Sequence, residues 1–394
     1  MNSLTKTCFW LSVFFIFYPA IVYPSLVCLM GLIRPRRVKR RPYMPTVTVL
    51  IPAYNEAKNI AATVRNKLKQ DYPRERLEII VISDCSTDGT DDIVREFSSP
   101  HVRIIQCERR QGKAAALNEG VRHAHGEILV FSDANSIFAS NAIRLMVENF
   151  ADSGVGYVTG NLTYKKQGSR ITGNGCSAYM RHENTLRVLE TRAGSIIGVN
   201  GGVDAIRREL YTDVPQQLIT DFVLPLQVIN TKHRVVYDER VHSSEVANIE
   251  LGSEFHMRVR VSLRALQGIS YMRRLCNPLN SPWPAFSLIS HKGIRYFGFV
   301  FLLLAFMTNL ALVSIPGYAA LFVAQAIAYL LALLGLLEKN PPSLLRKLTL
   351  IPAYFLMSNL AFGVAAFKFL QGETMATWQP RAGAQPSQRY GSVA

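Results

Sequence analysis

Residues 46–56 read TVTVLIPAYNE, and this stretch decides the fold. Its first six residues are β-branched or aliphatic, a composition typical of a strand buried on both faces of a sheet. The run ends at Pro52, which cannot donate to a neighbouring strand, and the polar residues Asn55 and Glu56 follow. We therefore expect a buried strand whose carboxyl end carries polar side chains.

The strand pattern recurs along the first half of the chain, and helical spacing separates the strands. In EILVFSDANS, residues 127–136, four apolar residues lead directly to Ser132 and Asp133, with Asn135 two residues further on. Strands that alternate with helical segments of about 10 to 15 residues predict βαβ units and a parallel sheet. The expected strands are residues 46–51, 77–83, 102–106 and 128–131, and the expected helices are residues 58–70, 113–123 and 141–150.

Polar side chains follow three of these strands at the point where each strand ends. Ligands of such sheets collect at the carboxyl ends of the strands, so the clustering favours a binding site. A simpler alternative stays open for any single loop, since Asp88-Gly89-Thr90-Asp91 also fits a turn followed by a helix cap. The residues that gather there are Asn55, Glu56, Asp84, Asp88, Asp133 and Asn135.

Known glycine motifs for nucleotides are missing from the sequence. No G-x-G-x-x-G follows the first strand, and no G-x-x-x-x-G-K-[ST] occurs. A nucleotide can still bind through carboxylates that accept from its base and ribose, while a divalent cation neutralises its diphosphate. The six cysteines show no C-x-x-C spacing, so we expect free thiols rather than a zinc site or disulfides.

Four long segments without charged residues predict membrane spans. Of the 394 residues, 49% are hydrophobic and only 18% are charged, which is unusual for a wholly soluble protein. Residues 8–33, 296–314, 318–337 and 350–367 are uncharged, and each is near the roughly 20 residues that cross a bilayer. The first segment is too long for a signal peptide and lacks a small-residue cleavage site, so we expect an anchor.

The basic run RPRRVKRR, residues 34–41, predicts the orientation, because basic collars lie on the cytoplasmic side. The N-terminus then lies outside the cell, and residues 34–295 lie on the cytoplasmic side of the plasma (inner) membrane. Contact with an anionic leaflet accounts in part for the net charge of +16. No basic stripe interleaved with aromatic residues appears, so the sequence does not favour nucleic-acid binding.

Six motifs in order carry a resemblance to a known family. They are TVLIPAYNEAKNI, VISDCSTDGT, RRQGKAAALNEG, VFSDAN, GVNGGVDAIRRE and ITDFVLPL. In order and spacing they resemble the membrane-bound family 2 glycosyltransferases, which include hyaluronan, chitin-oligosaccharide, poly-N-acetylglucosamine and cellulose synthases. The resemblance extends over residues 46 to about 270. It implies an α/β GT-A glycosyltransferase domain, with a mostly parallel sheet flanked by helices, plus α-helical transmembrane segments.

The resemblance implies a UDP-sugar donor. Asp84 matches the acid that contacts uracil and ribose, whereas Asp88 is expected to serve the shape of the loop. Lys113, in the match to G-K-A-x-A-x-N, would lie near the nucleotide; a solvated lysine in a first helical turn is the alternative. The implied nucleotide-sugar-binding residues are Pro52, Ala53, Tyr54, Asn55, Glu56, Asp84, Lys113 and Asp133.

Asp133 matches the first acid of the family's D-x-D metal motif, and Asn135 occupies the place of the second acid. A carboxamide oxygen can ligate a hard divalent cation but brings no charge. The resemblance therefore implies an Mg²⁺ or Mn²⁺ site at Asp133 and Asn135 that binds more weakly than two carboxylates would.

Asp221 matches the aspartate of the family's T-E-D motif, although Thr220 stands where many members have glutamate. This match implies the general base of an inverting transfer, in which the acceptor hydroxyl loses a proton as it attacks the sugar. Without the resemblance, LITDFVL would equally fit a helix start capped by Thr220 or Asp221.

The resemblance implies that two stretches hold the acceptor. Gly201 and Gly202 lie in a glycine-rich loop that permits close approach of the backbone. Arg260 and Arg264 are four residues apart on one face of a predicted helix, which fits contact with a diphosphate or lipid headgroups; a basic helix against the bilayer is the alternative.

The pattern departs from the processive members of the family at this helix. Arg264 matches the arginine of their Q-x-x-R-W signature, but Val261 and Ala265 replace the glutamine and the tryptophan. The departure puts long-chain synthesis in doubt. Trp283, next to basic residues, is expected to be an interfacial anchor rather than an acceptor platform.

The predicted function is inverting transfer from a UDP-sugar to a growing polysaccharide or oligosaccharide at the cytoplasmic face, with possible export. One rival transfers a single sugar to a lipid or lipid-linked acceptor, which the missing glutamine and tryptophan favour. A nucleotide-sensing transporter is remote, because the spans contain no ionisable residue. The predicted regions are residues 1–33 (anchor), 34–274 (cytoplasmic catalytic domain), 275–295 (interfacial segment), 296–370 (three transmembrane helices) and 371–394 (a disordered tail).

Overall fold

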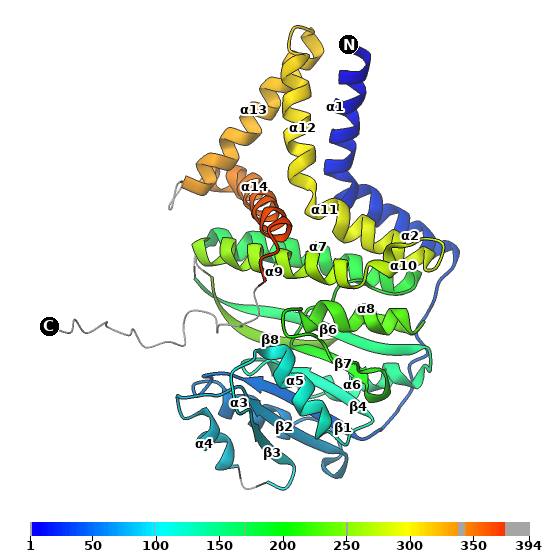
Figure 1. The fold of residues 1–394 in the computed structure, drawn as a ribbon, viewed down its shortest axis with the longest axis vertical. Helices are drawn as coiled ribbons and strands as arrows, with labels where there is room; N and C mark the ends of the chain where they lie inside the picture. Colours follow the sequence, from blue (N-terminus) through cyan, green and yellow to red (C-terminus); the bar gives the residue numbers. More distant parts are fainter. Residues whose placement is uncertain (1, 98, 169, 250, 338–342, 375–394) are drawn as a thin grey trace, which may run out of the picture. The chain divides into compact units, whose positions relative to one another are not determined.

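The computed structural model describes residues 2–97, 99–168, 170–249, 251–337 and 343–374. These residues form two compact units (Figure 1). The sheet unit comprises residues 38–168 and 198–248, and the helical unit comprises the described residues within 1–37, 169–197 and 249–375. Of the cysteines in the described part, Cys8, Cys28, Cys85, Cys107 and Cys276 are free thiols, as expected.

The sheet unit is built on one mixed sheet. Among the described residues the sheet has eight strands in the order β3-β2-β1-β4-β7-β6-β8-β5. The pairs β3–β2, β2–β1 and β1–β4 are parallel, whereas β4–β7, β7–β6 and β8–β5 are antiparallel. The strands are β1 (Val47–Ala53), β2 (Leu77–Ser83), β3 (Val102–Gln106), β4 (Ile128–Ser132), β5 (Ile137–Phe138), β6 (Val155–Gly168), β7 (Val203–Arg207) and β8 (Arg234–Ile249).

The parallel half of the sheet confirms the predicted βαβ alternation. All four expected strands form, and the connecting helices are close to the expected bounds. The expectation of a mostly parallel sheet describes only this half, because β7, β6, β8 and β5 extend the sheet by antiparallel pairing. The helices of this unit are α3 (Ile60–Leu68), α4 (Thr90–Arg95), α5 (Lys113–Arg122), α6 (Ala142–Glu148) and α8 (Thr220–Asn230).

The first strand is buried along its whole length, as its composition predicts. Val47, Val49 and Ile51 pack into a core that includes residues of α3 and α6. On the other face, α5 approaches closely at Gly120, where a Cβ would lie 3.1 Å from a methyl group of Leu50. Helices on both faces thus fix the strand, and with it the position of the polar residues at its carboxyl end.

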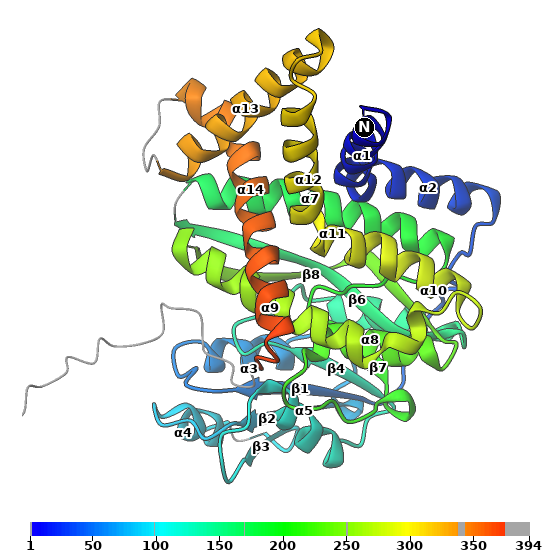
Figure 2. The ribbon, with the colours of Figure 1, turned by 45° about the horizontal axis from the view of Figure 1, so that its top comes forward.

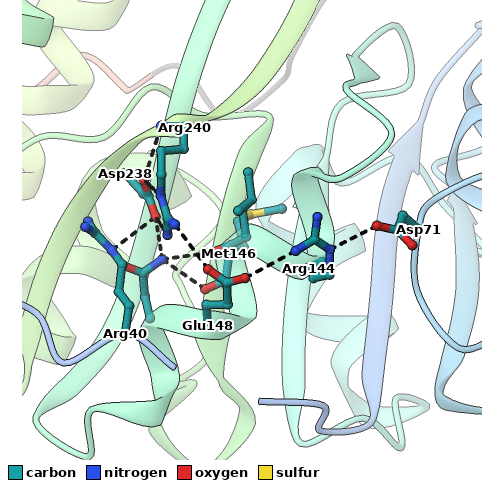
Figure 3. A network of polar contacts seen from close by, with 9 residues as sticks. Arg40, Asp71, Arg144, Met146, Glu148, Asp238 and Arg240 are labelled. Carbon is teal, nitrogen blue, oxygen red and sulfur yellow. Dashed lines mark hydrogen bonds and ion pairs between the residues drawn. The ribbon is translucent and has the colours of Figure 1, made fainter. Parts of the chain in front are cut away.

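An ion-pair network holds the start of the sheet unit against β8 (Figure 3). Asp238, which is 1% exposed, pairs with Arg240 at 2.8 Å and with Arg40 at 3.3 Å. Arg240 also pairs with Glu148, at 3.2 Å. Arg40 belongs to the basic run of residues 34–41, so this arginine has a structural contact in addition to any role in a basic collar.

The helical unit contains the apolar segments. Three of its helical stretches are long and apolar enough to cross a membrane: Ser3–Ile33, Pro316–Leu337 and Leu348–Leu370. In both views α1 and α12 run side by side (Figures 1 and 2). The helices are α1 (Asn2–Phe17), a π-helical turn (Tyr18–Val22), α2 (Tyr23–Ile33), α7 (Arg170–Ala193), α9 (Leu251–Tyr271), α10 (Pro282–Ser287), a second π-helical turn (Leu288–Gly293), α11 (Ile294–Tyr296), α12 (Gly298–Ala311), α13 (Pro316–Leu337) and α14 (Ser343–Leu370).

The expected span at residues 296–314 is the exception. Its helix α12 has 14 residues. At about 1.5 Å per residue such a helix is shorter than the hydrocarbon core of roughly 30 Å. It reaches the length of a span only together with Pro282–Tyr296, from which it is bent by 57°. The described chain therefore has three candidate spans, or four if the bent pair counts as one.

Buried polar and charged side chains join α7 to the predicted interfacial segment within the helical unit. His291 lies between two glutamates of α7, with Nδ1 2.9 Å from Glu190 and Nε2 3.4 Å from Glu183. The Tyr23 hydroxyl donates to Glu190 at 2.6 Å, and Arg295 pairs with Glu183. The segment 275–295 is thus fastened by internal ion pairs.

Contacts group α7 and α9 with the apolar helices, although both fall inside the predicted domain 34–274. The predicted regions are continuous in sequence, whereas each compact unit combines separate stretches of the chain. The predicted domain boundaries therefore stay a prediction. Most of the predicted tail, residues 375–394, lies outside the described residues.

Candidate active site

The loop after β1 is clasped to the loop after β2. Asn55 adopts φ 53°, a left-handed conformation that asparagine tolerates better than most residues. Its side-chain oxygen accepts from the backbone of Thr87 at 2.8 Å, and its own N–H donates to the Ser86 hydroxyl at 3.2 Å. Pro52 and Ala53 are buried as the last residues of β1, so they act as scaffold for this loop.

Two more residues of this loop shape the candidate donor site. The Arg110 guanidinium lies over the ring of Tyr54 at 3.7 Å, an attractive cation–π arrangement. Glu56 is 6% exposed and accepts from Asn59 at 2.8 Å. Burial raises the pKa of Glu56 above its ordinary value.

Asp84 and Asp88 both accept hydrogen bonds from backbone N–H groups. The two oxygens of Asp84 accept from the N–H groups of Gln111 and Gly112, each at 2.8 Å, and so fix the entry to α5. Asp88 accepts from Ala57 at 2.9 Å and from Thr90 at 3.1 Å. This geometry agrees with the structural role expected for Asp88, and it gives Asp84 a positioning role beside its predicted contact with the nucleotide.

Lys113, the first residue of α5, connects the predicted metal residue to the predicted base. Its ammonium donates to Asp133 at 2.8 Å and lies 3.3 Å from Asp221. Burial would lower the pKa of Lys113, but the carboxylates of Asp133 and Asp221 outweigh it and raise the pKa. The side chain is 21% exposed, so it is not the solvated surface lysine of the alternative interpretation.

Asp221 lies in the first turn of α8. The residue at the N-cap is Ile219, and no side chain caps this helix. The alternative interpretation of Thr220 or Asp221 as a cap is therefore wrong, and the carboxylate of Asp221 is directed to Lys113 instead. With 29% of the side chain exposed, Asp221 can reach a bound ligand.

The glycine pair Gly201–Gly202 makes room for these carboxylates. Both residues have φ +71°, a conformation that other residues rarely adopt. A Cβ on Gly201 would lie 2.9 Å from Cγ of Asp221. A Cβ on Gly202 would lie 3.2 Å from Oδ2 of Asp133. The sequence predicted these glycines for acceptor binding; the structure also makes them part of the wall around both acids.

Asp204 is a buried acid that the sequence did not single out. It is fully buried in β7, and among the described residues neither of its carboxylate oxygens has a hydrogen-bond partner. Burial, followed by the charge of Asp221, raises its pKa to about 8, although Thr159 and Lys113 act in the opposite direction. The neutral form of this carboxyl group is therefore favoured beside the candidate base. The one sequence signal was an aspartate within the apolar strand VDAIR.

Glu245 is a second missed residue beside the metal motif. It lies in β8, is 4% exposed and accepts from the hydroxyl of Ser136, the residue after Asn135. Nothing in the sequence around residue 245 marks it, because 109 residues separate the two partners.

The donor set at Asp133 fits a hard divalent cation. The predicted ligands, the Asp133 carboxylate and the Asn135 amide, offer oxygens that Mg²⁺ and Mn²⁺ accept and that a soft metal would not select. In the described part of the chain, no group of three His, Cys, Asp or Glu side chains is arranged to hold a metal ion.

The remaining predicted acceptor residues belong to the helical unit. Arg260 and Arg264 are in α9, one continuous helix, so their spacing of four keeps them on one face. Trp283 packs on Phe286 at 5.8 Å and joins a cluster with Tyr23 and Val27. The ring of Trp283 thus packs within the helical unit, and its role as an interfacial anchor stays a prediction.

The fold and the strand-end acids define the class of protein, a GT-A glycosyltransferase fold. The chain is similar to the solved structure of the mannosyltransferase PcManGT from Pyrobaculum calidifontis in complex with GDP-Man and Mn²⁺. The similarity covers 94% of this chain and 99% of that one, with a TM-score of 0.71 and 25% identity. The predicted fold class is thereby confirmed.

The family follows from the sequence of the same region. Residues 48–213 match the model of Glycosyl transferase family 2, so this part of the chain is a family 2 glycosyltransferase domain. A poly-beta-1,6-N-acetyl-D-glucosamine synthase of Staphylococcus epidermidis is 25% identical over 265 residues, which are 63% of each chain. The glycosyltransferase AglE of Haloferax volcanii is 35% identical over 123 residues, which are 31% of this chain and 40% of AglE. The match thus spans less than two thirds of the length of these curated relatives.

Proposed function

We propose that the chain is a metal-dependent, inverting glycosyltransferase that uses a nucleoside-diphosphate sugar. One observation carries the proposal: Lys113 holds Asp133 and Asp221, which come from the ends of different elements, on a single ammonium group. The predicted metal residue and the predicted base thus face the same space. That arrangement fits transfer to a hydroxyl more closely than it fits nucleotide sensing, which needs no base.

Asp221 is the group that takes the proton. The acceptor oxygen attacks the anomeric carbon as the bond from that carbon to the diphosphate breaks, and the hydroxyl proton passes to the Asp221 carboxylate. Attack from the face opposite the leaving group inverts the anomeric configuration. Asp204, neutral and buried, adds no negative charge beside Asp221 at pH 7.

Asp133 and Asn135 would hold Mg²⁺ or Mn²⁺, and the bound cation supplies positive charge for the departing diphosphate. Lys113 adds a second positive charge at the same position. Hydrogen bonds fix the loops at Asn55, Asp84 and Asp88, so the candidate donor site needs little reorganisation during the reaction.

Two donor classes follow from two observations. The sequence motifs resemble those of UDP-sugar enzymes, whereas the solved relative that matches over 99% of its length is a mannosyltransferase complexed with GDP-Man. A test of the proposal therefore needs sugars of both nucleotides, UDP and GDP.

Transfer of one sugar to a lipid or lipid-linked acceptor is the second candidate function. The replacements at Val261 and Ala265 favour it, because they remove the glutamine and tryptophan of the processive signature. Both candidate functions use the same chemistry at Asp221. They differ in the acceptor and in whether the product stays bound for another round of transfer.

The apolar helices support an integral membrane location. Three or four candidate spans and the basic run at residues 34–41 fit a multi-pass protein of the plasma (inner) membrane whose sheet unit is cytoplasmic. In that location the enzyme meets soluble donors on one side and carbohydrate or glycolipid acceptors at the bilayer.

The test is a donor panel with the purified full chain in detergent or nanodiscs. Labelled UDP-sugars and GDP-sugars are incubated with Mg²⁺, Mn²⁺ or EDTA, beside Asp221→Asn, and nucleotide release and product size are measured. We expect release with one donor class that needs a divalent cation and is lost in the variant. No release with any donor, or equal turnover by Asp221→Asn, would refute the proposal. Product size separates chain synthesis from single transfer.

A further inference from the structure

The metal motif of this chain lacks one carboxylate. Asp133 provides the first acid, but the second position holds Asn135, whose amide oxygen has no charge. A divalent cation bound to one carboxylate and a diphosphate would leave the protein with a single negative ligand. An acid supplied by another part of the chain would restore the second negative ligand.

The antiparallel pair β5–β8 brings such an acid to the motif. In its register Ile137 lies opposite Ser244 and Phe138 opposite Ser243. The next position in this register sets Ser136 opposite Glu245. The side chains confirm the placement, since the Ser136 hydroxyl donates to Oε1 of Glu245. Glu245 therefore lies across from the residue that directly follows Asn135.

Glu245 and Asp133 converge on the same small space beside Gly202. A Cβ built on Gly202 would lie 3.0 Å from Oε1 of Glu245, 3.0 Å from Oγ of Ser136 and 3.2 Å from Oδ2 of Asp133. Two oxygens from the segment between β4 and β5 and one from β8 thus surround one point that only glycine leaves open. These are the hard donor atoms that Mg²⁺ and Mn²⁺ bind.

We propose that Glu245 supplies the second carboxylate of the metal site and takes the place of the acid that is missing at Asn135. The proposal rests on the proposed function, because it concerns the same cation. The metal site would then consist of Asp133 after β4 and Glu245 in β8, with the diphosphate of the donor as a further ligand. The alternative is a structural one, in which Glu245 only offsets the charge of the buried Lys67.

The experiment measures Mn²⁺ binding to the full chain by the loss of the free-ion EPR signal, with UDP or with GDP present and without acceptor. The variants are Glu245→Gln, Asn135→Asp and the double variant. The matched control is Asp238→Asn, which removes a buried acid from the same strand at the ion-pair network of Figure 3. Circular dichroism checks that each protein is folded.

We expect Glu245→Gln to weaken Mn²⁺ binding by roughly 10- to 100-fold, the range seen when groups that support a metal site are removed. Asn135→Asp in the Glu245→Gln background should restore most of the affinity, because it returns one carboxylate to the site. Asp238→Asn should leave the Mn²⁺ affinity of the folded protein unchanged.

The other outcomes decide against the proposal in different ways. Wild-type affinity in Glu245→Gln would overturn the role of Glu245 and leave the proposed function intact. A loss that Asn135→Asp does not restore would overturn the claim that Glu245 replaces the missing acid, and would favour the structural role beside Lys67. Absence of Mn²⁺ binding by the wild type with either nucleotide would refute the metal-dependent function itself.

Discussion

Each unit of the molecule contains a cluster of acidic and basic side chains, and the two clusters differ in how their charges are matched. In the helical unit Glu183 and Glu190 are at most 1% exposed and are surrounded by Arg295, His291 and the Tyr23 hydroxyl. In the sheet unit Asp133 and Asp221 share Lys113 and are about one third exposed. The buried, paired charges of the helical unit hold its helices together. The partly exposed acids of the sheet unit share one lysine and can therefore receive a ligand.

The excess of acid in the sheet unit is the more informative property. Four carboxyl groups, those of Asp133, Asp204, Asp221 and Glu245, gather around the lysine side chains of Lys113 and Lys67, and burial lowers the pKa of Lys67. Such an arrangement is costly unless a proton or a cation compensates it. The neutral form of Asp204 provides one compensation, and a divalent cation would provide the other.

The largest effect should come from removing the candidate base. Asp221→Asn keeps the size of the side chain but cannot take a proton, so transfer should fall by roughly 100- to 10,000-fold. Because Lys113 keeps Asp133 as a partner at 2.8 Å, the apparent Tm should change little. Nucleotide release and thermal unfolding of the same preparation measure the two effects. A fall in Tm that accounts for the lost activity would assign Asp221 to the fold and not to the reaction.

The opposite result is expected in the helical unit. Glu183→Gln removes the buried carboxylate that pairs with Lys292 and Arg295, which should cost about 3–5 kcal/mol of stability. Denaturant unfolding in detergent measures this loss, with the surface variant Asp213→Asn as the control. The folded fraction should still bind Mn²⁺ and nucleotide. Unchanged stability in Glu183→Gln would remove the distinction drawn between the two clusters.

Gly201 tests the geometry of the sheet-unit cluster without changing its charge. In Gly201→Ala the new Cβ would press on the Asp221 side chain, and a small displacement of a reacting group can cost about 100-fold in rate. The left-handed φ alone costs roughly 1–2 kcal/mol. Gly372→Ala is the matched control, because that glycine has φ +74° and no atom within 4 Å of the added Cβ. Equal activity of the two variants would show that Asp221 tolerates displacement.

The parallel half of the sheet was predictable because its strands are buried on both faces and read as continuous apolar runs. Thr46 to Ile51 is such a run, and the turn residues Asn55 and Asp88 lie in the loops that follow two of these strands. Sequence-local patterns of this kind also placed Asp133 and Asp221 correctly at element ends. Their convergence on Lys113 needed the folded chain, because α5 and α8 are far apart in sequence.

Glu245, Asp204 and the buried glutamates of α7 could not be predicted, and the physical reasons differ. Glu245 reaches the metal motif through the antiparallel pairing of β8 with β5, a long-range register that no local period specifies. Asp204 sits in a strand where an acid is normally unfavourable. Glu183 and Glu190 have the spacing of an ordinary polar helix face, and only burial distinguishes them.

The smallest expected effect concerns Asp204, and its sign follows from its raised pKa. The folded protein keeps this carboxyl group protonated up to about pH 8, whereas an unfolded chain ionises it near pH 4. Between these values the folded state therefore binds more protons, and the contribution of Asp204 to stability falls as the pH rises, by up to about 1.4 kcal/mol per pH unit. The carboxamide introduced by Asp204→Asn cannot ionise, so this contribution is absent from the variant.

The variant Asp204→Asn should accordingly become more stable relative to the wild type as the pH is raised from 6 to 8, and the difference should level off above pH 8. Denaturant unfolding of the metal-free full chain at several pH values measures the difference, with Asp213→Asn as a surface control that should follow the wild type. A constant difference across this range would mean that Asp204 is ionised in the folded protein. The sheet-unit cluster would then carry one more negative charge than proposed, and its demand for a cation would be larger.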